Sequence, residues 1–64
     1  MEIIVIISKE GIFKGVMRNN DKTLMYWAED YQAKNGLIGS IEIDYYNAKM
    51  KIGSESFYII FESL

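Results

Sequence analysis

Two acidic side chains that alternate along one expected strand form the pair whose spacing could support catalysis. Glu42 and Asp44 stand two residues apart within residues 40–46, so their side chains would project from one strand face about 7 Å apart. Carboxylates at about this separation can act as general acid and general base. They can equally form a solvated strand face that Lys49 and Lys51 balance from the next strand. We expect the second arrangement, because so short a chain has little room for a substrate cleft.

The other residue types give no catalytic arrangement either. The chain contains no Cys and no His, which excludes disulfides, thiolate chemistry, conventional zinc sites and histidine acid–base catalysis. A hard cation needs more oxygen ligands than one strand supplies, and the serines have no histidine to activate them. No glycine-rich phosphate loop is present. We therefore expect a protein that is not an enzyme and that holds no metal and no cofactor.

Length, charge and composition narrow the class of protein. Residues 1–64 make a single small domain, half of whose residues are hydrophobic, so its stability must come from dense apolar packing or from self-association. The net charge of −2 has the wrong sign for general nucleic-acid binding. The apolar residues 1–8 are too few for a membrane span and lack the basic leader of a signal peptide. We expect a cytoplasmic location and no membrane association.

The segment Asp21–Gly36 is the only one predicted to be a helix. Its larger apolar residues recur at the spacing i, i+3, i+4 and i+7, and they are Leu24, Trp27, Ala28 and Tyr31. Asp21 or Thr23 can serve as the N-cap, because either side-chain oxygen can accept a bond from the first turn. Gly36 is a stop signal, since glycine adopts the left-handed conformation at little cost. We expect Trp27 to pack in the core rather than to anchor a partner.

The rest of the chain is predicted to form strands, which gives the order ββαβββ. The expected strands are residues 2–8, 12–18, 40–46, 48–52 and 56–62. The first and last are apolar on both faces, which is typical of central strands. Residues 40–46 and 48–52 alternate between apolar and polar residues, whereas both faces of residues 12–18 are mixed. We predict a single α+β domain in which one helix packs on a four- to five-stranded, mostly antiparallel sheet.

One stretch has a resemblance that bears on the topology. The segment from Tyr31 to Ile52, YQAKNGLIGSIEIDYYNAKMKI, resembles the helix end, loop and hairpin of the immunoglobulin-binding domains of protein G. The resemblance covers about a third of the chain and rests on its turns and its alternation. It implies a β-grasp-like sheet in which the first and last strands pair in parallel at the centre. The fifth strand departs from that four-stranded fold, and the resemblance implies nothing about antibody binding.

The two central strands carry more apolar side chains than one helix can cover. In the first strand Ile4 and Ile6 alternate with the other apolar residues, and in the last strand Tyr58 and Ile60 do so. We expect these four side chains to face away from the helix. An apolar patch with a charged rim is typical of a protein interface. The predicted partner-binding residues are Ile4, Ile6, Glu42, Asp44, Tyr46, Lys49, Lys51, Tyr58 and Ile60.

Three uses of that patch remain open. The sheet could close into a small barrel and bury both faces, the patch could join copies of the chain, or it could bind a different protein. We favour a non-enzymatic protein-interaction module, an inhibitor or adaptor, that acts by stoichiometric binding through the sheet face or by strand addition at an edge. Abundant Ile, Lys, Asn and Tyr without Pro fit an AT-rich genome, including a viral one or a mobile element.

Two alternative functions follow from the same residues. A small nucleic-acid-binding β-domain would use Tyr46, Tyr58, Lys49 and Lys51, although acidic residues share their face. A homo-oligomeric structural protein would use the apolar patch. The expected partner is another protein or a second copy of the chain, and nucleic acid is the weaker candidate.

Overall fold

A helix packs against one face of an antiparallel sheet of five strands. The computed structural model describes residues 1–20 and 22–63. The elements are β1 (Glu2–Ser8), β2 (Phe13–Arg18), α1 (Thr23–Asn35), β3 (Ile41–Asp44), β4 (Lys49–Ile52) and β5 (Glu55–Ser63). The strand order across the sheet is β2-β1-β5-β4-β3, and every neighbouring pair is antiparallel. The predicted α+β class and the order ββαβββ are confirmed.

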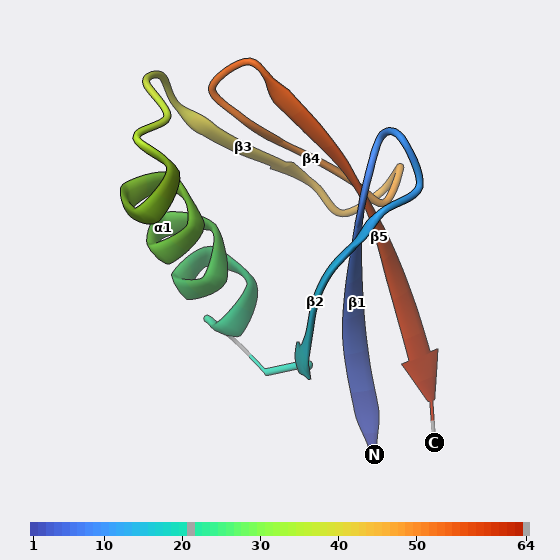
Figure 1. Cartoon of the computed structure of the whole chain (residues 1–64). Helices are drawn as coiled ribbons and strands as arrows, with labels where there is room; N and C mark the ends of the chain where they lie inside the picture. The colour runs from blue at the N-terminus through green and yellow to red at the C-terminus, as the bar shows by residue number, and fades with distance from the viewer. Residues whose placement is uncertain (21, 64) are drawn as a thin grey trace.

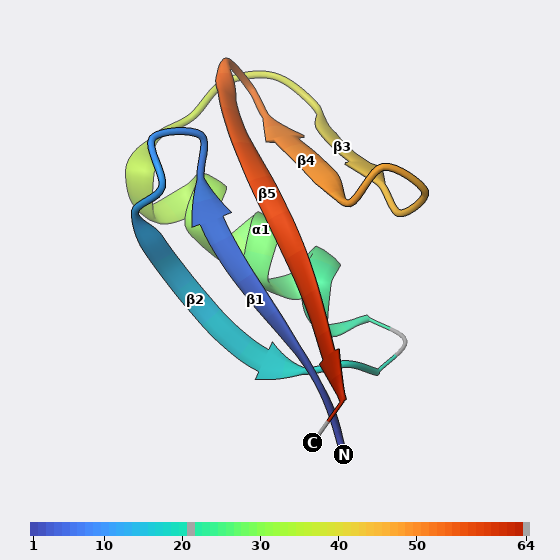
Figure 2. The ribbon, with the colours of Figure 1, turned by 90° about the vertical axis from the view of Figure 1, so that its right-hand side faces the viewer.

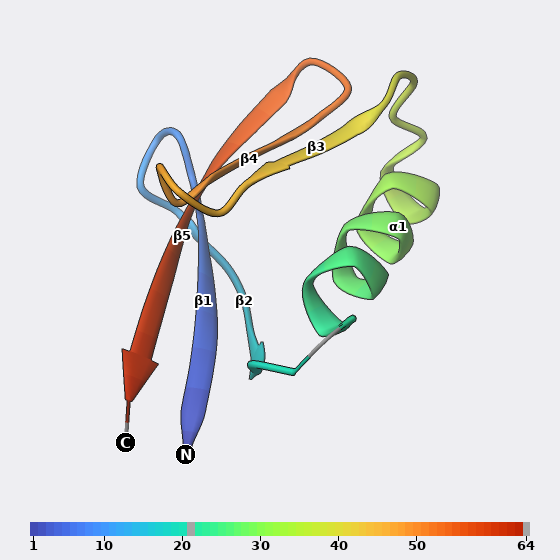
Figure 3. The ribbon, with the colours of Figure 1, turned by 180° about the vertical axis from the view of Figure 1, so that it is seen from behind.

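The helix lies on one side of the sheet and leaves the other side uncovered. In Figure 1 α1 stands apart from the strands on one side, and Figure 3 shows the same arrangement from behind. In Figure 2 the strands are in front and α1 lies behind them. We call the face away from α1 the outer face. The sheet is open, with β2 and β3 at its edges, so the described residues do not form the closed barrel that the sequence left possible.

The first and last strands are neighbours, as predicted, but they run in opposite directions. Glu2 pairs with Ser63 and Ser8 pairs with Phe57, so β1 and β5 are antiparallel. The β-grasp-like parallel pairing is therefore wrong in direction. Three strands follow the helix here, and short turns join them. One more reversal than in a four-stranded β-grasp fold brings the last strand back with the opposite polarity.

The apolar stripe of α1 lies where the 3.6-residue period places it. Leu24 and Ala28 are buried against the sheet, and Trp27 and Tyr31 are half-buried beside them. The two rings stack with centroids 5.0 Å apart. Both meet Phe57 of β5 edge-on, at 5.9 Å from Trp27 and 5.3 Å from Tyr31, an arrangement that the ring quadrupoles favour. The predicted core position of Trp27 is confirmed.

The two ends of the helix differ in how well the sequence predicted them. The helix begins at Thr23, and its N-cap residue Lys22 makes no side-chain capping hydrogen bond. The predicted N-cap role of Thr23 is wrong, because Thr23 is already the first residue of the helix and Lys22 stands at the N-cap position. The Thr23 hydroxyl donates to the carbonyl of Arg18 at 2.7 Å and so ties the helix to the end of β2. Asp21, the other predicted cap, lies outside the described residues. At the C-terminus Gly36 takes the left-handed conformation with φ of 61°, as predicted.

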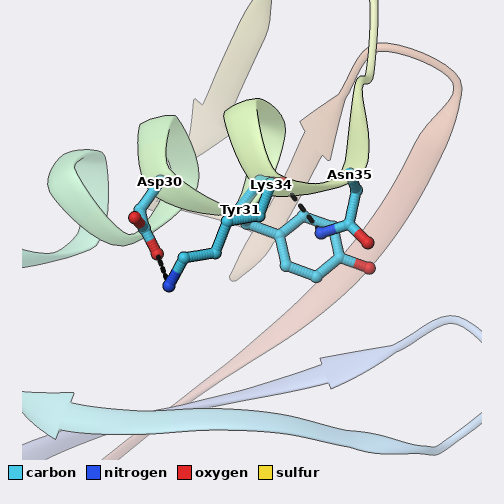
Figure 4. Close-up of polar contacts among 4 residues, drawn as sticks. All are labelled: Asp30, Tyr31, Lys34 and Asn35. Carbon is cyan, nitrogen blue, oxygen red and sulfur yellow. Dashed lines mark hydrogen bonds and ion pairs between the residues drawn. The ribbon is translucent and has the colours of Figure 1, made fainter.

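Polar contacts on the solvent side of α1 are local. Asp30 and Lys34 form an exposed i, i+4 ion pair of 3.0 Å, and the side-chain amide of Asn35 donates to the carbonyl of Tyr31 at 2.8 Å (Figure 4). An exposed pair of this kind contributes only a few tenths of a kcal/mol. The helix is therefore held mainly by its apolar stripe.

Tyr31 makes the stability of the fold depend on pH in the alkaline range. Burial, the hydrogen bond that its hydroxyl donates to Glu55 at 3.2 Å and the charge of Glu55 all raise the pKa of Tyr31 above its ordinary value of 10.0. A group whose pKa is higher in the folded chain contributes stability below its unfolded pKa and loses it as the pH rises through the folded pKa. We expect Tyr31→Phe to reduce the loss of stability above about pH 10, measured by urea unfolding at several pH values. Tyr26→Phe at an exposed helix position should leave that loss unchanged.

The core lies between α1 and the inner faces of the central strands. Its buried apolar residues are Ile4, Ile6, Leu24, Ala28, Met50, Ile52, Phe57 and Ile59. Gly15 of β2 allows the helix to approach, since a Cβ at this position would stand 2.6 Å from Nε1 of Trp27. The register of β1 against β2 also shifts next to this glycine. Gly15 therefore marks both of the features that a glycine within a strand suggests, a bulge and a close approach.

Candidate functional site

The outer face carries an apolar patch that no element of the described chain covers. Cross-strand partners in a sheet share a face, and the pairing joins Val16 to Val5 and Val5 to Ile60 in one row. It joins Phe13 to Ile7 and Ile7 to Tyr58 in the next row. We define the outer patch by these six residues: Val5, Ile7, Phe13, Val16, Tyr58 and Ile60. The last four in this list are exposed, so the two rows form a continuous apolar surface on three strands.

The sequence predicted this patch but assigned the wrong residues of β1 to it. Ile4 and Ile6 are only 1 % and 0 % exposed and lie in the core, so their predicted position on the outer face is wrong. Val5 and Ile7 take their places beside Tyr58 and Ile60, which lie on the outer face as predicted. Both sets of alternate residues in β1 are apolar, and a shift of one residue in the pairing register exchanges the set that faces the core with the set that faces outward.

Charged residues border the outer patch at both ends of its strands. At one end Ile3 of β1 lies between Arg18 of β2 and Glu62 of β5. At the other end the backbone amide of Lys9 donates to the carbonyl of Ser56 at 3.1 Å, and Ser56 pairs with Lys51 of β4. The patch therefore has the apolar centre and the charged rim of a protein interface.

A shallow groove lies beside the patch, over β5 and β4. It has a volume of about 420 Å³, and its lining includes Lys9, Glu42, Asp44, Lys49, Lys51, Ser56 and Tyr58. Ser56 is small and stands between longer side chains, which leaves the hollow at this point of the sheet. Four of the predicted rim residues thus lie together with Tyr58, as the alternation of β3 and β4 indicated. Lys9 was not predicted, because its position depends on the pairing of the first turn with β5.

The register of β3 against β4 confirms the predicted charge pairing. Asp44 stands opposite Lys49, and Glu42 stands opposite Lys51. Within residues 1–20 and 22–63, none of these four side chains takes part in an ion pair of 4.0 Å or less. The pairing is therefore complementary but loose, and Lys49 and Lys51 keep their ammonium groups available on the outer face.

Asp44 also has a local structural role. Its carboxylate accepts the backbone amide of Asn47 at 3.0 Å and the side-chain amide of Asn47 at 2.8 Å. The hydrogen bond from the Asn47 side chain and those from the backbone amides of the turn lower the pKa of Asp44, because they favour the charged form. A general acid needs a raised pKa instead, so these bonds suit Asp44 to shaping the β3–β4 turn. Tyr46 lies in that turn, 95 % exposed and beyond the outer patch.

The described residues offer few other candidate sites. No group of three or more carboxylates that could hold a metal ion occurs among residues 1–20 and 22–63. In the same part of the chain, no helix has both the length and the apolar character needed to cross a membrane. The outer patch with its adjoining groove is therefore the feature of the described chain to which we assign a candidate function. Comparison of the chain with protein-family models, curated proteins and solved structures finds no match to any of them.

Proposed function

We propose that the protein is a small interaction module that acts by stoichiometric binding to another protein chain and not by catalysis. The outer patch carries this proposal, since four exposed apolar side chains, Phe13, Val16, Tyr58 and Ile60, lie next to one another on a sheet face. Soluble monomers seldom expose a continuous apolar surface unless it binds something. For a domain of this size, covering it would add several kcal/mol at about 25 cal/mol per Å².

Binding through the face is favoured over strand addition at an edge. The edge strand β3 has only four residues, Ile41–Asp44, and a short edge offers few backbone groups to an added strand. At the other edge, the register shift leaves Lys14 of β2 without a partner residue in β1. Bulges and lysines at an edge discourage pairing with a further strand. The outer face has neither kind of protection.

As an interaction module, the protein would act as an inhibitor or an adaptor. It would cover a surface of its partner, or hold two chains together, with no chemical step. The composition of the chain supports a viral or mobile-element origin, and small proteins that block a larger one by steric occlusion fit such an origin. This role needs only an exposed apolar face and a rim that orients the partner.

A second candidate function, binding of a nucleic acid, rests on the groove. Lys9, Lys49 and Lys51 lie there next to Tyr58, and cations beside an aromatic ring can hold a single strand. Glu42 and Asp44 line the same groove and would repel a phosphate backbone. A protein partner can place a cation opposite these carboxylates, so we favour protein binding.

The test compares two tyrosine variants on opposite sides of the molecule. Tyr58→Lys introduces a charge into the outer patch, and Tyr26→Lys introduces the same charge on the helix, where the side chain is 61 % exposed against 49 % for Tyr58. Immobilised wild type and variants are incubated with an extract of the source cells, and retained proteins, copies of this chain included, are quantified. Tyr58→Lys should weaken retention roughly 30-fold, or about 2 kcal/mol for a central interface tyrosine, while Tyr26→Lys should not.

Two controls make that comparison decisive. Circular dichroism checks that both variants keep the fold. Raising the salt from about 50 to about 200 mM should change retention little, whereas a phosphate-driven contact weakens steeply over this range. Equal retention by all three proteins would contradict the proposal, and a nucleic acid released by salt would favour the second candidate instead.

A further inference from the structure

We infer that the chain which covers the outer patch is a second copy of this protein, packed face to face about a two-fold axis that crosses the strands. The inference rests on the proposed function, because it names the partner for the same surface. The order of the cross-strand rows on the outer face supports it. An interface about a two-fold axis must be complementary to itself, so each row has to match the row that the axis brings onto it.

The two apolar rows match each other under this operation. An axis midway between the row Val5–Ile60 and the row Ile7–Tyr58 brings Val5 onto Ile7 of the other copy and Ile60 onto Tyr58. On β2 it brings Val16 towards Phe13. Each apolar side chain of the outer patch therefore meets an apolar side chain. Sheets packed face to face keep their strands within about 30° of each other, so this correspondence survives the twist of the sheet.

The charged rows match as well. Glu62 lies one row beyond Ile60 on the outer face, and the same axis brings it over Ser56 of the other copy. Lys9 and Lys51 flank Ser56 on either side. None of these three charged side chains has an ion-pair partner within 4.0 Å among the described residues. Symmetry would thus form two clusters, each with one carboxylate between two ammonium groups.

The alternative axis, parallel to the strands along β5, fails this comparison. It would bring Lys49 of one copy over Ile7 of the other, and Lys51 over Lys9. One cation would then cover an apolar side chain and another would meet a like charge, and both contacts cost free energy. The axis across the strands places apolar on apolar and opposite charges together, and we therefore choose it.

The required area is within reach of this face. A specific interface buries at least about 1,000 Å² in total, or about 500 Å² from each copy. That is roughly a ninth of the 4457 Å² that the chain exposes. The molecule measures 34 × 23 × 20 Å along its principal axes, so one broad side can supply this area. The dimer belongs to the small, weak class of interfaces, and its dissociation should be visible on dilution.

The experiment is a charge exchange followed by sedimentation equilibrium over a range of concentrations. Wild type should shift from 7.4 kDa towards twice this mass as the concentration rises. Glu62→Lys should weaken dimerisation at least tenfold, because it sets three cations together. The double variant Lys9→Glu/Lys51→Glu should do the same with three carboxylates. All three side chains are exposed, so the variants should keep the fold, which circular dichroism verifies.

Mixing the two variants distinguishes this geometry from any other dimer. One cluster of the mixed dimer then holds the wild-type charges, and the other holds the same charges exchanged. The mixture should therefore dimerise more strongly than either variant alone, and Glu29→Lys on the helix should leave the wild-type behaviour unchanged. Dimers that are insensitive to these substitutions, or no rescue on mixing, would overturn the inferred interface.

A monomer at every concentration would also overturn this inference, and the tyrosine comparison separates that outcome from failure of the proposed function. If Tyr58→Lys still abolishes retention of a different protein, the outer patch binds that protein and only the inferred second copy is wrong. If Tyr58→Lys changes neither mass nor retention, both proposals fail.

Discussion

Phe57→Ala is expected to be strongly destabilising at 25 °C. Phe57 is 2 % exposed, and its ring is the one that both Trp27 and Tyr31 meet edge-on. Truncating a buried phenylalanine to alanine costs about 3–5 kcal/mol. A chain of this length has about 3–10 kcal/mol of stability in all, so the variant loses between about a third and all of it. Circular dichroism and the fluorescence of Trp27 measure the loss in a urea titration.

A phenylalanine on the same strand provides the control. Phe61 also lies on β5 but is 40 % exposed, and its ring stacks on the exposed Tyr45, with centroids 6.5 Å apart. Phe61→Ala should therefore cost about 1 kcal/mol, near the centre of the distribution for point substitutions. Equal unfolding midpoints for the two variants would mean that the helix does not close the core on Phe57.

Gly53→Ala is expected to be the most destabilising of the glycine substitutions. Gly53 has φ of +59°, and a Cβ there would stand 2.4 Å from the carbonyl oxygen of Ile38. That oxygen belongs to the backbone, and the amide of Gly53 donates to the carbonyl of Ser40 at 3.1 Å. Neither of the two backbone segments can therefore move without a cost in free energy. The left-handed conformation costs about 1–2 kcal/mol for an alanine, and overpacking adds about 1–3 kcal/mol. Urea unfolding of the variant measures the sum.

Gly36→Ala isolates the steric part of this effect. Gly36 has nearly the same φ, +61°, but a Cβ there would meet nothing within 4 Å. The variant should lose only the conformational part, about 1–2 kcal/mol. The difference between the two unfolding free energies is then the cost of the contact with Ile38. Losses of equal size would show that the loop before β3 moves aside and that its close approach to the β4–β5 turn is not important for stability.

Elements with one clearly apolar face were predictable from the sequence. The stripe of α1 has a single apolar side, so the period alone identified Leu24 and Ala28 as core residues. In β3 and β4 the alternation leaves one register that keeps the charges outside, and Glu42 therefore stands opposite Lys51 as expected. Gly36 ended the helix because glycine adopts the left-handed conformation at little cost, which depends on the local backbone alone. In each case the residues concerned had no alternative of similar energy.

Elements with two apolar faces were not predictable in the same way. In β1 either set of alternate residues could fill the core, and only the pairing of Ile6 with Gly15 and Ile59 decides between them. The direction of β5 depends on how many strands follow the helix. The resemblance of the segment from Tyr31 to Ile52 to another fold carries no information on that number. Thr23 was expected to cap α1, but it lies inside the helix, one residue after the N-cap, and its hydroxyl donates to a carbonyl of the preceding strand. These outcomes depend on tertiary contacts rather than on local propensity.

The pairing of Glu2 with Ser63 has a consequence for how the protein is made. β1 is synthesised before β5, its neighbour at the centre of the sheet, so the two halves of the core cannot join until β5 has also left the ribosome. Contacts between segments so distant in sequence slow folding. Until they form, β1 exposes a run of five apolar residues, from Ile3 to Ile7. Before β5 is made, the antiparallel hairpin with β2 can pair one edge of β1, and the other edge stays open until β5 arrives.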